Sequence, residues 1–588
     1  MMSAKDNLSP VEKIKTSSNG LRGTLKESLL DNFTGAIRED DQNLIKFHGM
    51  YQQDDRDRRE ERVSKKLEWL YSFMIRLRLP GGFLTSDQWI GLNEIAGNHS
   101  TGTIKITTRQ TIQLHGILKS HIKPTIQSFN LQHLDSIAAC GDVNRNVTCT
   151  SNPSESPLHQ EAYELAGKIS ELCLPKTKAY YDIWIDDELV VDRKAEEDPL
   201  YQDRYLPRKL KIGIAVPPNN DVDVFINDIA LIAIIENDQI VGYNIAAGGG
   251  LGSTHGNEAT YARLASVLGF VDTEEKVLKA VYEIITVQRD FGNRSDRKLS
   301  RLKYTIDKLG IEQYRSEVEK RCGFSFEPAR EYHFEQRKDR YGWVKNHEGK
   351  WFYTVFVEHG RVLDEAVGSQ ILVENNKPGD KQTLYSAIQT DEVSQNYYPL
   401  KSGLLKIAET GKATFRFTCN QNLIVSDVHE DDKAEIEQIL KEYGISDYTE
   451  KASALRKNSV ACVAFNTCSL ALAEGQRYLP TLVTRIEPLL EKYGLFEEDI
   501  TIRMTGCPNG CGRSPNAEIG FVGTAYGKYN LHIGGDRLGT RLNTKYKDNI
   551  GEDEILKTLD ELFGIYVQKR EAEETFGDFS YRYLQITK

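Results

Sequence analysis

Apolar and polar residues alternate along several short segments of the chain, which predicts β-strands that bury one face. Between residues 103 and 115 four of the even positions are apolar, whereas the odd positions are polar or basic. The apolar set is Ile104, Ile106, Ile112 and Leu114, and the polar set is Lys105, Thr107, Arg109, Thr111, Gln113 and His115. Because successive side chains of a strand alternate, we expect the first set to face a core and the second to share the opposite face.

Two further segments show the same basic alternation. Arg76 and Arg78 alternate with apolar neighbours, and so do Lys209 and Lys211. A single row of this kind is typical of any half-exposed strand. Three rows in a chain of formal net charge -11 favour a shared anionic ligand, since Arg and Lys bind carboxylates and oxyanions. Arg145, between Asn144 and Asn146, is a further candidate, with an ordinary surface loop as the alternative.

Two pairs of segments resemble each other across the length of the chain. Residues 102–114 have a weaker echo in residues 412–424, and residues 209–213 have one in residues 501–505. These echoes predict an internal duplication, with two related halves about a pseudo-twofold axis. We therefore expect an α+β fold in which mixed sheets are flanked by helices, arranged in three domains.

Composition shifts divide the chain into segments. We predict a charged N-terminal arm at 1–66, a central domain from 67–138 and 341–426, a second domain at 139–340 and a third at 427–588. Mixed charges between residues 39 and 66 indicate either a solvated arm or a segment that docks a partner.

Length, charge and hydrophobicity indicate which classes of protein the chain can belong to. The 588 residues suffice for three or four domains' worth of core, and 39% hydrophobic with 27% charged residues is typical of a soluble protein. The net negative charge gives no field for nucleic acid or an anionic membrane. The first 15 residues show no secretory signal, and the longest apolar run, residues 229–235, is too short to span a bilayer. We expect a cytoplasmic location.

A glycine-rich run at residues 248–252 suggests a dinucleotide site but does not fit the fingerprint, because no glycine or alanine follows Gly252 at the third position. We interpret the run as backbone packed closely against a ligand.

Four of the nine cysteines form two close pairs, Cys462 with Cys468 and Cys507 with Cys511. Without secretory features, such groups are typical of metal ligands. A structural zinc accepts the second spacing but not the wider first one, so the spacing favours an iron–sulfur cluster over zinc. Asn509 and Gly510 lie between the second pair and favour a tight turn.

These pairs resemble the cluster signature of the siroheme-containing sulfite and nitrite reductases. The resemblance extends from about residue 65 to 580 and includes the segments 76–82, 108–115, 144–152 and 206–211. The segment 144–150 is more similar to the sulfite branch than to the nitrite branch. Gly141 stands where we expect Asn in close relatives.

The resemblance implies a [4Fe-4S] cluster on all four cysteines, with Cys511 also the axial thiolate of siroheme. It implies that Arg109, His115 and Asn509 contact the cofactors, and that Arg76, Arg145, Lys209 and Lys211 hold sulfite. The second domain would then bind siroheme and substrate, and the third the cluster. It further implies six-electron reduction of sulfite in sulfate assimilation, with NADPH electrons delivered by a flavoprotein (alpha) subunit carrying FAD and FMN. Alternatives are a ferredoxin-dependent sulfite or nitrite reductase, and a zinc-stabilised binding protein without activity.

Overall fold

The computed structural model describes residues 7–151, 155–176, 183–185, 188–191, 198–364, 370–374, 381–385 and 398–587. The first six residues of the predicted arm, and Asn152 at the end of a family-like segment, lie outside these ranges. Within them, no helix combines the length and the hydropathy needed to cross a bilayer.

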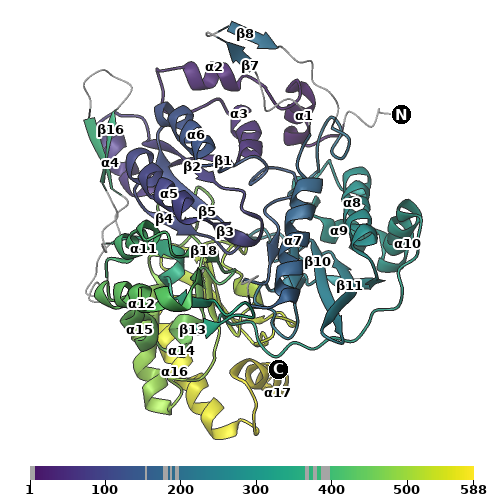
Figure 1. Ribbon diagram of the computed structural model, residues 1–588, viewed down its shortest axis with the longest axis vertical. Helices are drawn as coiled ribbons and strands as arrows, with labels where there is room; N and C mark the ends of the chain where they lie inside the picture. The colour runs from purple at the N-terminus through teal and green to yellow at the C-terminus, as the bar shows by residue number, and fades with distance from the viewer. Residues whose placement is uncertain are drawn as a thin grey trace.

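Two five-stranded antiparallel sheets with matching strand orders form the centre of the molecule (Figure 1). The first sheet contains, in order, β1 Met50–Asp54, β2 Tyr71–Arg76, β5 Ile112–Ile117, β4 Ile104–Ile106 and β15 Arg361–Val362. The second contains β13 Gly342–Lys345, β14 Trp351–Val355, β19 Leu423–Val428, β18 Thr414–Phe417 and β3 Phe83–Leu84. The helices that accompany them are α5 Ser86–His99, α6 Ile122–Leu131, α11 Leu400–Glu409 and α12 Lys433–Glu442.

The two central sheets exchange their edge strands. β3 follows β2 in the chain but pairs with β18 of the second sheet, and β15 follows β14 but pairs with β4 of the first. Their apolar residues form one shared core, in which Trp89 of α5 stacks on Phe415 of β18 at 4.9 Å between ring centroids. Because each half supplies a strand to the other, neither sheet is complete alone.

Two outer sheets also share one topology, with three parallel strands followed by two antiparallel ones. One contains β6 Thr148–Cys149, β9 Ile212–Ala215, β10 Ile229–Glu236, β11 Gln239–Ala247 and β12 Ser266–Val271. The other contains β20 Ser459–Ala461, β21 Ile502–Thr505, β22 Ile519–Ala525, β23 Lys528–Ile533 and β24 Thr544–Ile550.

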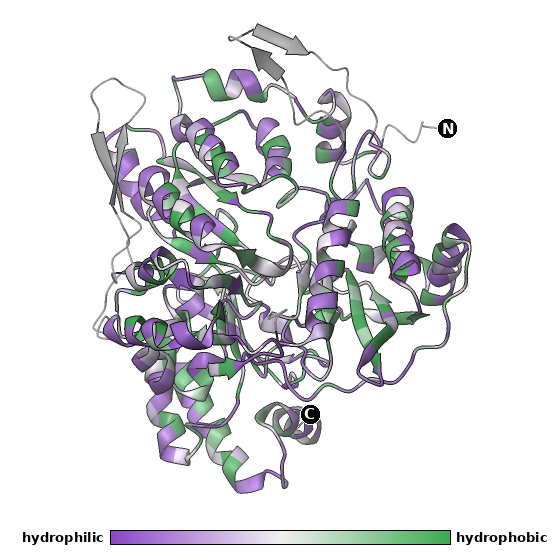
Figure 2. Ribbon diagram, viewed as in Figure 1, coloured by the Kyte–Doolittle hydropathy of each residue, from purple (hydrophilic) through white to green (hydrophobic). Residues whose placement is uncertain are grey.

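Helices cover both outer sheets. The first is accompanied by α7 Pro157–Leu172, α8 Glu274–Phe291, α9 Leu302–Leu309 and α10 Ile311–Cys322, and the second by α15 Leu479–Tyr493, α16 Glu552–Lys569 and α17 Phe576–Thr587. Two short helices, α13 Ile445–Lys451 and α14 Ala454–Lys457, lead into β20. The strands β10 and β11 are largely apolar, as Figure 2 shows, because the sheet is covered and its residues are buried. Two hairpins are also described, β7 Ile183–Ile185 with β8 Glu188–Val191, and β16 Gln370–Glu374 with β17 Lys381–Tyr385.

This topology agrees with the predicted duplication, but the predicted alignment of residues 209–213 with residues 501–505 was wrong. The strand β9 corresponds to β21, and the backbone N–H groups of Lys211 and Thr501 both donate to a carboxylate, of Asp228 and Glu518 respectively. Thr501 therefore matches Lys211, two positions from the predicted Lys209. A shift of two residues keeps every side chain on the same face of a strand, so the alternation could not reveal it.

Residues 103–115 are a hairpin and not one continuous strand. The strands β4 and β5 pair with Lys105 opposite Gln113, and the turn between them places Gln110 at φ 51°. The predicted faces survive, since Ile104, Ile106, Ile112 and Leu114 are all fully buried. The turn has neither glycine nor proline, so the sequence carries no turn signal there.

From residue 7 onward the predicted arm is folded into the molecule, so its interpretation as a solvated arm was wrong for the described residues. Its elements are α1 Pro10–Ser17, α2 Leu25–Leu30, α3 Asp41–Leu44, β1 and α4 Arg59–Ser64, with single turns η1 Ile45–His48 and η2 Arg56–Arg58. The Lys15 ammonium is fully buried, where it donates to the carbonyl of Leu206 at 2.8 Å and pairs with Asp142 at 3.4 Å. Charges buried as pairs look solvated in a sequence because their partners are distant along it.

Candidate active site around four cysteines

The four cysteines are placed by the parallel strands β20 and β21. Cys462 directly follows β20, and Cys507 and Cys511 follow β21. Because neighbouring parallel strands end at one edge of the sheet, these residues meet there, and the Cys462 N–H donates to the carbonyl of Met504 at 3.2 Å. Cys468 comes from residues 462–478, a loop without a helix or strand between β20 and α15.

The environment of the sulfurs suits thiolate ligands. The N–H of Gly506 donates to Cys462 Sγ at 3.2 Å, and the amide Nδ2 of Asn509 donates to Cys507 Sγ at 3.4 Å. Burial, and next the nearby Cys511 thiol, raise the pKa of Cys462 and of Cys507 to about 12. The four thiols are thus close enough to disfavour one another's ionisation, and bound iron would offset that repulsion.

The four thiols do not form a site for a single ion. Among the described residues, no three His, Cys, Asp or Glu side chains converge as ligands of one metal ion would. A tetrahedral zinc requires four sulfurs at about 2.3 Å from one centre. Ligands at the corners of an iron–sulfur cube are spread more widely than those of a single ion.

The predicted basic residues converge near Cys511. Arg76 ends β2, Arg109 lies in the turn between β4 and β5, and Lys209 and Lys211 precede β9. Burial, and then the charges of Arg109 and Arg301, lower the pKa of Lys211 to about 7, whereas Cys511 raises it. Burial and Lys211 hold the pKa of Lys209 well below its usual range. Both lysines therefore lie near Cys511 and near each other, and a negatively charged ligand would favour their protonated forms.

Hydrogen bonds fix the arginines of this site. Arg109 donates from Nη1 to Asn227 Oδ1 at 2.7 Å, and from Nη2 to the carbonyls of Asn146 and Ile212. Arg76 Nη1 donates to Cys140 Sγ at 3.1 Å. Arg145 donates from Nε to the carbonyl of Gly141 at 3.0 Å and from Nη2 to the hydroxyl of Tyr51.

Arg78 belongs elsewhere. It pairs with Asp135 at 2.8 Å beyond the end of β2, and thus leaves the basic row predicted from alternation. A strand that ends at Arg76 no longer dictates which way residue 78 points.

His115 lies on β5 and contacts the cysteine loop. Its Nδ1 is 3.0 Å from Gln53 Oε1 and 3.3 Å from Thr467 Oγ1. Burial, followed by the charge of Lys105, lowers the pKa of His115 to about 3, so the imidazole is neutral. The predicted cofactor contact is compatible with this position beside the loop that carries Cys468.

The glycine run packs against the chain itself, which corrects our interpretation of it as ligand-facing. A Cβ on Gly249 would lie 2.2 Å from the carbonyl oxygen of Phe225, and one on Gly252 would lie 3.0 Å from that of Asn509. Lys303, which the sequence did not single out, donates to the carbonyls of Gly250 and Gly252. The run therefore packs against the 507–511 turn and supports it.

The ring of Phe47 leaves no room for a side chain at Gly141. Its φ is 93°, and a Cβ there would lie 2.9 Å from the ring of Phe47. The residue expected from the family would not fit beside Phe47 without a shift.

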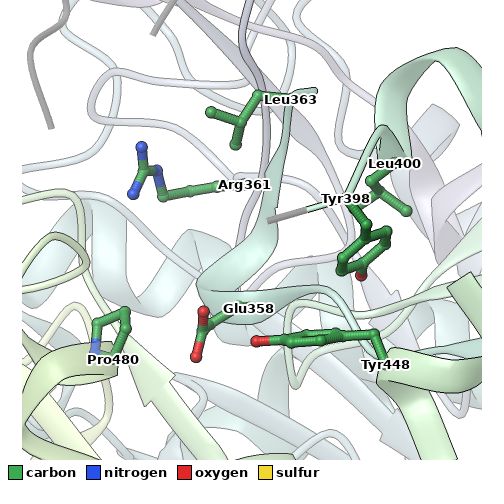
Figure 3. Close-up of a pocket in the computed structure, with 7 residues that line it drawn as sticks. All are labelled: Glu358, Arg361, Leu363, Tyr398, Leu400, Tyr448 and Pro480. Atoms are coloured by element: carbon green, nitrogen blue, oxygen red, sulfur yellow. The ribbon is translucent and has the colours of Figure 1, made fainter. Parts of the chain in front are cut away.

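One small cavity lies outside this site. Figure 3 shows the hydroxyl of Tyr448 directed toward Glu358, with Arg361 and Tyr398 nearby. Glu358 also pairs with Arg456 at 2.5 Å, so its charge is satisfied within the protein. This cavity carries structural pairs and none of the predicted site residues.

Comparisons with known proteins agree with this site. The "nitrite and sulphite reductase 4Fe-4S domain" matches residues 164–326, and the "nitrite/sulfite reductase ferredoxin-like half domain" matches residues 70–131 and 398–443. The second model matches both central halves, which confirms the duplicated fold. The first covers the outer sheet that has no cluster cysteines, the topological counterpart of the sheet that has them.

Whole-length relatives have the same family name. A protein of Leptospira biflexa named sulfite reductase [NADPH] hemoprotein beta-component is 59% identical over 97% of this chain and 97% of its own. One of Bacillus pumilus with that name is 50% identical over 98% and 95%. The structure of NirA from Mycobacterium tuberculosis superposes with a TM-score of 0.75 at 22% identity, over 99% of this chain and 97% of NirA, which confirms the α+β fold. The chain therefore belongs to the nitrite and sulfite reductase family.

Proposed function

We propose that this chain is the hemoprotein subunit of an assimilatory NADPH-dependent sulfite reductase, which reduces sulfite to hydrogen sulfide by six electrons. The observation that carries the proposal is the convergence of Lys209, Lys211, Arg109 and the exposed Cys511 on one site. High identity to relatives with that name supports the same reaction.

The cysteines and basic residues fit the two cofactors of this reaction. Cys462, Cys468, Cys507 and Cys511 would hold a [4Fe-4S] cluster, and Cys511 would also bind siroheme iron. When bound, these cofactors would supply the electrons for sulfite reduction. The carboxylates of siroheme would be neutralised by buried cations such as Arg109, which otherwise lack counter-charge.

The remaining side chains bind the substrate and move protons. Arg76 and Arg145 are held by hydrogen bonds, so they present fixed charge to a doubly negative oxyanion. Lys211, with a pKa lowered to about 7, both attracts the anion when protonated and releases a proton near neutral pH. Lys209 lies beside it and shares this role. Each S–O cleavage consumes protons, and these two ammonium groups would deliver them.

Electrons would come from a flavoprotein partner that carries FAD and FMN. The N-terminal segment, predicted from its charge to dock this partner, exposes large apolar side chains, among them Leu30 at 68% and Phe33 at 99%. We propose that they contact the flavoprotein, since exposed apolar groups close together favour protein interfaces. Free, buried cysteines such as Cys149 and Cys322 are compatible with a reducing, cytoplasmic location.

The visible spectrum with iron, sulfide and siroheme analysis tests the cofactors. Turnover of sulfite and nitrite with reduced methyl viologen, and then with NADPH plus flavoprotein, tests the reaction. Preference for nitrite, or activity with ferredoxin alone, would favour the ferredoxin-dependent alternative. Zinc without a Soret band would favour the non-catalytic binding protein and contradict the proposal.

A double variant L30A/F33A tests the docking surface. We expect lower NADPH-driven activity with unchanged methyl viologen-driven activity. The control is L131A, since Leu131 is 79% exposed on α6, outside the N-terminal segment. Equal NADPH-driven activity in all three proteins would contradict this surface.

A further inference from the structure

The turn η2 lies against the loop that carries Cys468. Arg56 Nη1 donates to the carbonyl oxygens of Cys468 at 3.0 Å and of Ala471 at 2.8 Å. The Arg56 backbone N–H donates to the carbonyl of Asn466 at 3.2 Å. Its guanidinium also lies over the ring of Phe465, 4.4 Å from the centroid. One residue thus contacts four residues of a loop that follows it by more than 400 positions.

The neighbouring residues hold the turn in place. The carboxylate of Asp55 accepts from the N–H of Asp57 at 3.2 Å and thereby caps η2. Asp57 pairs with Arg477, at the far end of the cysteine loop, at 2.5 Å. Both ends of the Cys468 segment are therefore attached to η2.

Cys468 needs such support more than the other three cysteines. Cys462 and Cys507 lie within two residues of β20 or β21, and Cys511 lies three residues before the single turn η11 Ser514–Asn516, whereas residues 463–478 contain no regular element. A loop held by few contacts opens easily. The positive charge of Arg56 also attracts the Cys468 thiolate.

We propose that Arg56 is a positioning residue of the iron–sulfur site, which holds the Cys468 loop closed and stabilises negative charge on the cluster. This inference rests on the cluster proposed above. Two consequences can be separated. The hydrogen bonds to Cys468 and Ala471 slow opening of the loop and loss of the cluster. The charge favours the reduced, more negative cluster and raises its midpoint potential.

The experiment compares wild-type holoenzyme with R56Q and R56K. Cluster loss is followed as the decay of visible absorbance with an iron chelator, and the cluster potential by an EPR-monitored redox titration. For R56Q we expect loss of the cluster to be roughly three- to tenfold faster, since a charged donor to two carbonyls is removed, and a lower midpoint potential. R56K keeps the charge but not the flat guanidinium, so its potential should stay close to wild type while cluster loss is intermediate.

Hydrogen exchange adds a readout independent of the spectrum. Amides of residues 466–471 should exchange faster in R56Q, whereas those of β21 should not change. R59Q is the matched control, because Arg59 lies in the same segment but pairs with Asp54 and stacks on Trp69. A wild-type protein without a cluster would contradict the proposed function. A wild-type cluster with equal loss rate, potential and exchange in R56Q would overturn this inference alone.

Discussion

Two loops of the molecule occupy corresponding places, and only one of them carries redox ligands. Residues 217–221 follow β9 and read Pro-Pro-Asn-Asn-Asp, whereas residues 507–511 follow β21 and read Cys-Pro-Asn-Gly-Cys. Each is followed by a residue in the left-handed region, Asp223 at φ 47° and Arg513 at φ 60°, and then by a single helical turn. The two loops thus share one backbone arrangement, and their chemistry differs because of a few side chains at matching positions.

The difference extends to the charges around each loop. Cys511 is exposed toward the basic site, whereas its counterpart Asp221 is buried and accepts from the N–H and hydroxyl of Ser151 at 2.8 and 2.6 Å. Lys211 corresponds to Thr501, and Arg109, in the turn between β4 and β5, corresponds to Asn420 between β18 and β19. The second half of the chain therefore provides the thiols, whereas the first half provides the cations that lie near them.

Replacing Cys511 removes one of the two thiols that distinguish residues 507–511 from residues 217–221. In C511S we expect sulfite reduction to fall on the order of a thousandfold or more, because the thiol proposed to hold both cofactors would be lost. The measurement is methyl viologen-driven sulfite turnover together with the visible spectrum. C322S is the control, since Cys322 is buried at the end of α10, away from the site. A normal spectrum and turnover in C511S would contradict the assignment of this ligand.

The two loops are joined by Asp223, and its charge can be removed alone. Its carboxylate pairs with Arg503, Arg513 and Arg337 at 2.6, 2.7 and 3.1 Å, and these charges hold its pKa far below the usual range. D223N would leave three buried guanidinium groups without this partner, so we expect a loss of about 3–5 kcal/mol in the free energy of unfolding.

Urea denaturation measures that loss. D135N is the matched control, because Asp135 pairs with Arg78 where both side chains are partly exposed, and it should cost less than about 1 kcal/mol. Equal free energies of unfolding for D223N and D135N would mean that the ion pairs of Asp223 between the two halves are no stronger than a partly exposed pair.

The charge of Lys211, in the copy without the four cysteines, should be visible as a pH dependence of stability without cofactors. The pKa of Lys211 is lowered to about 7, below its unfolded value, so between pH 7 and 10 the unfolded chain binds more protons at this residue. Its contribution thus makes the folded state more stable as pH rises through this window. K211M should reduce that slope by up to about 1.4 kcal/mol per pH unit.

Chemical denaturation of the cofactor-free chain at several pH values gives the slope. K338M serves as the control, since the Lys338 side chain is 43% exposed and its pairing with Asp499 is at the surface. An unchanged slope in K211M would mean that Lys211 is not a buried cation of this site.

The smallest effect is expected for the two matched asparagines. Asn509 donates to Cys507 Sγ at 3.4 Å, whereas Asn219, its counterpart, has no thiol beside it among the contacts described. N509A should lower the midpoint potential of the cluster slightly, because a hydrogen bond to sulfur stabilises the reduced form. N219A should not change it. Equal potentials in all three proteins would remove Asn509 from the cofactor contacts.

The sequence predicted the faces of strands better than their ends. Burial of Ile104 and Leu114 followed from alternation, but the turn at Gln110 did not, because a side chain with φ 51° leaves no compositional signal. The four candidate cluster ligands could be named because their pairs are local in sequence, and the strands β20 and β21 place three of them at one sheet edge. The support from Arg56 and the buried pairing of Lys15 could not, since each joins residues more than 100 positions apart.

The exchange of β3 and β15 has a consequence for how the chain is made. The first central sheet gains its last strand only with Arg361 and Val362, so during synthesis about 250 residues follow β4 before its open edge is covered. An uncovered edge strand can pair with other chains. We expect the ribosome-bound N-terminal half to need chaperones. Variants in which residues 361–362 pair late with β4 should aggregate, although the molecules that do fold should keep their activity.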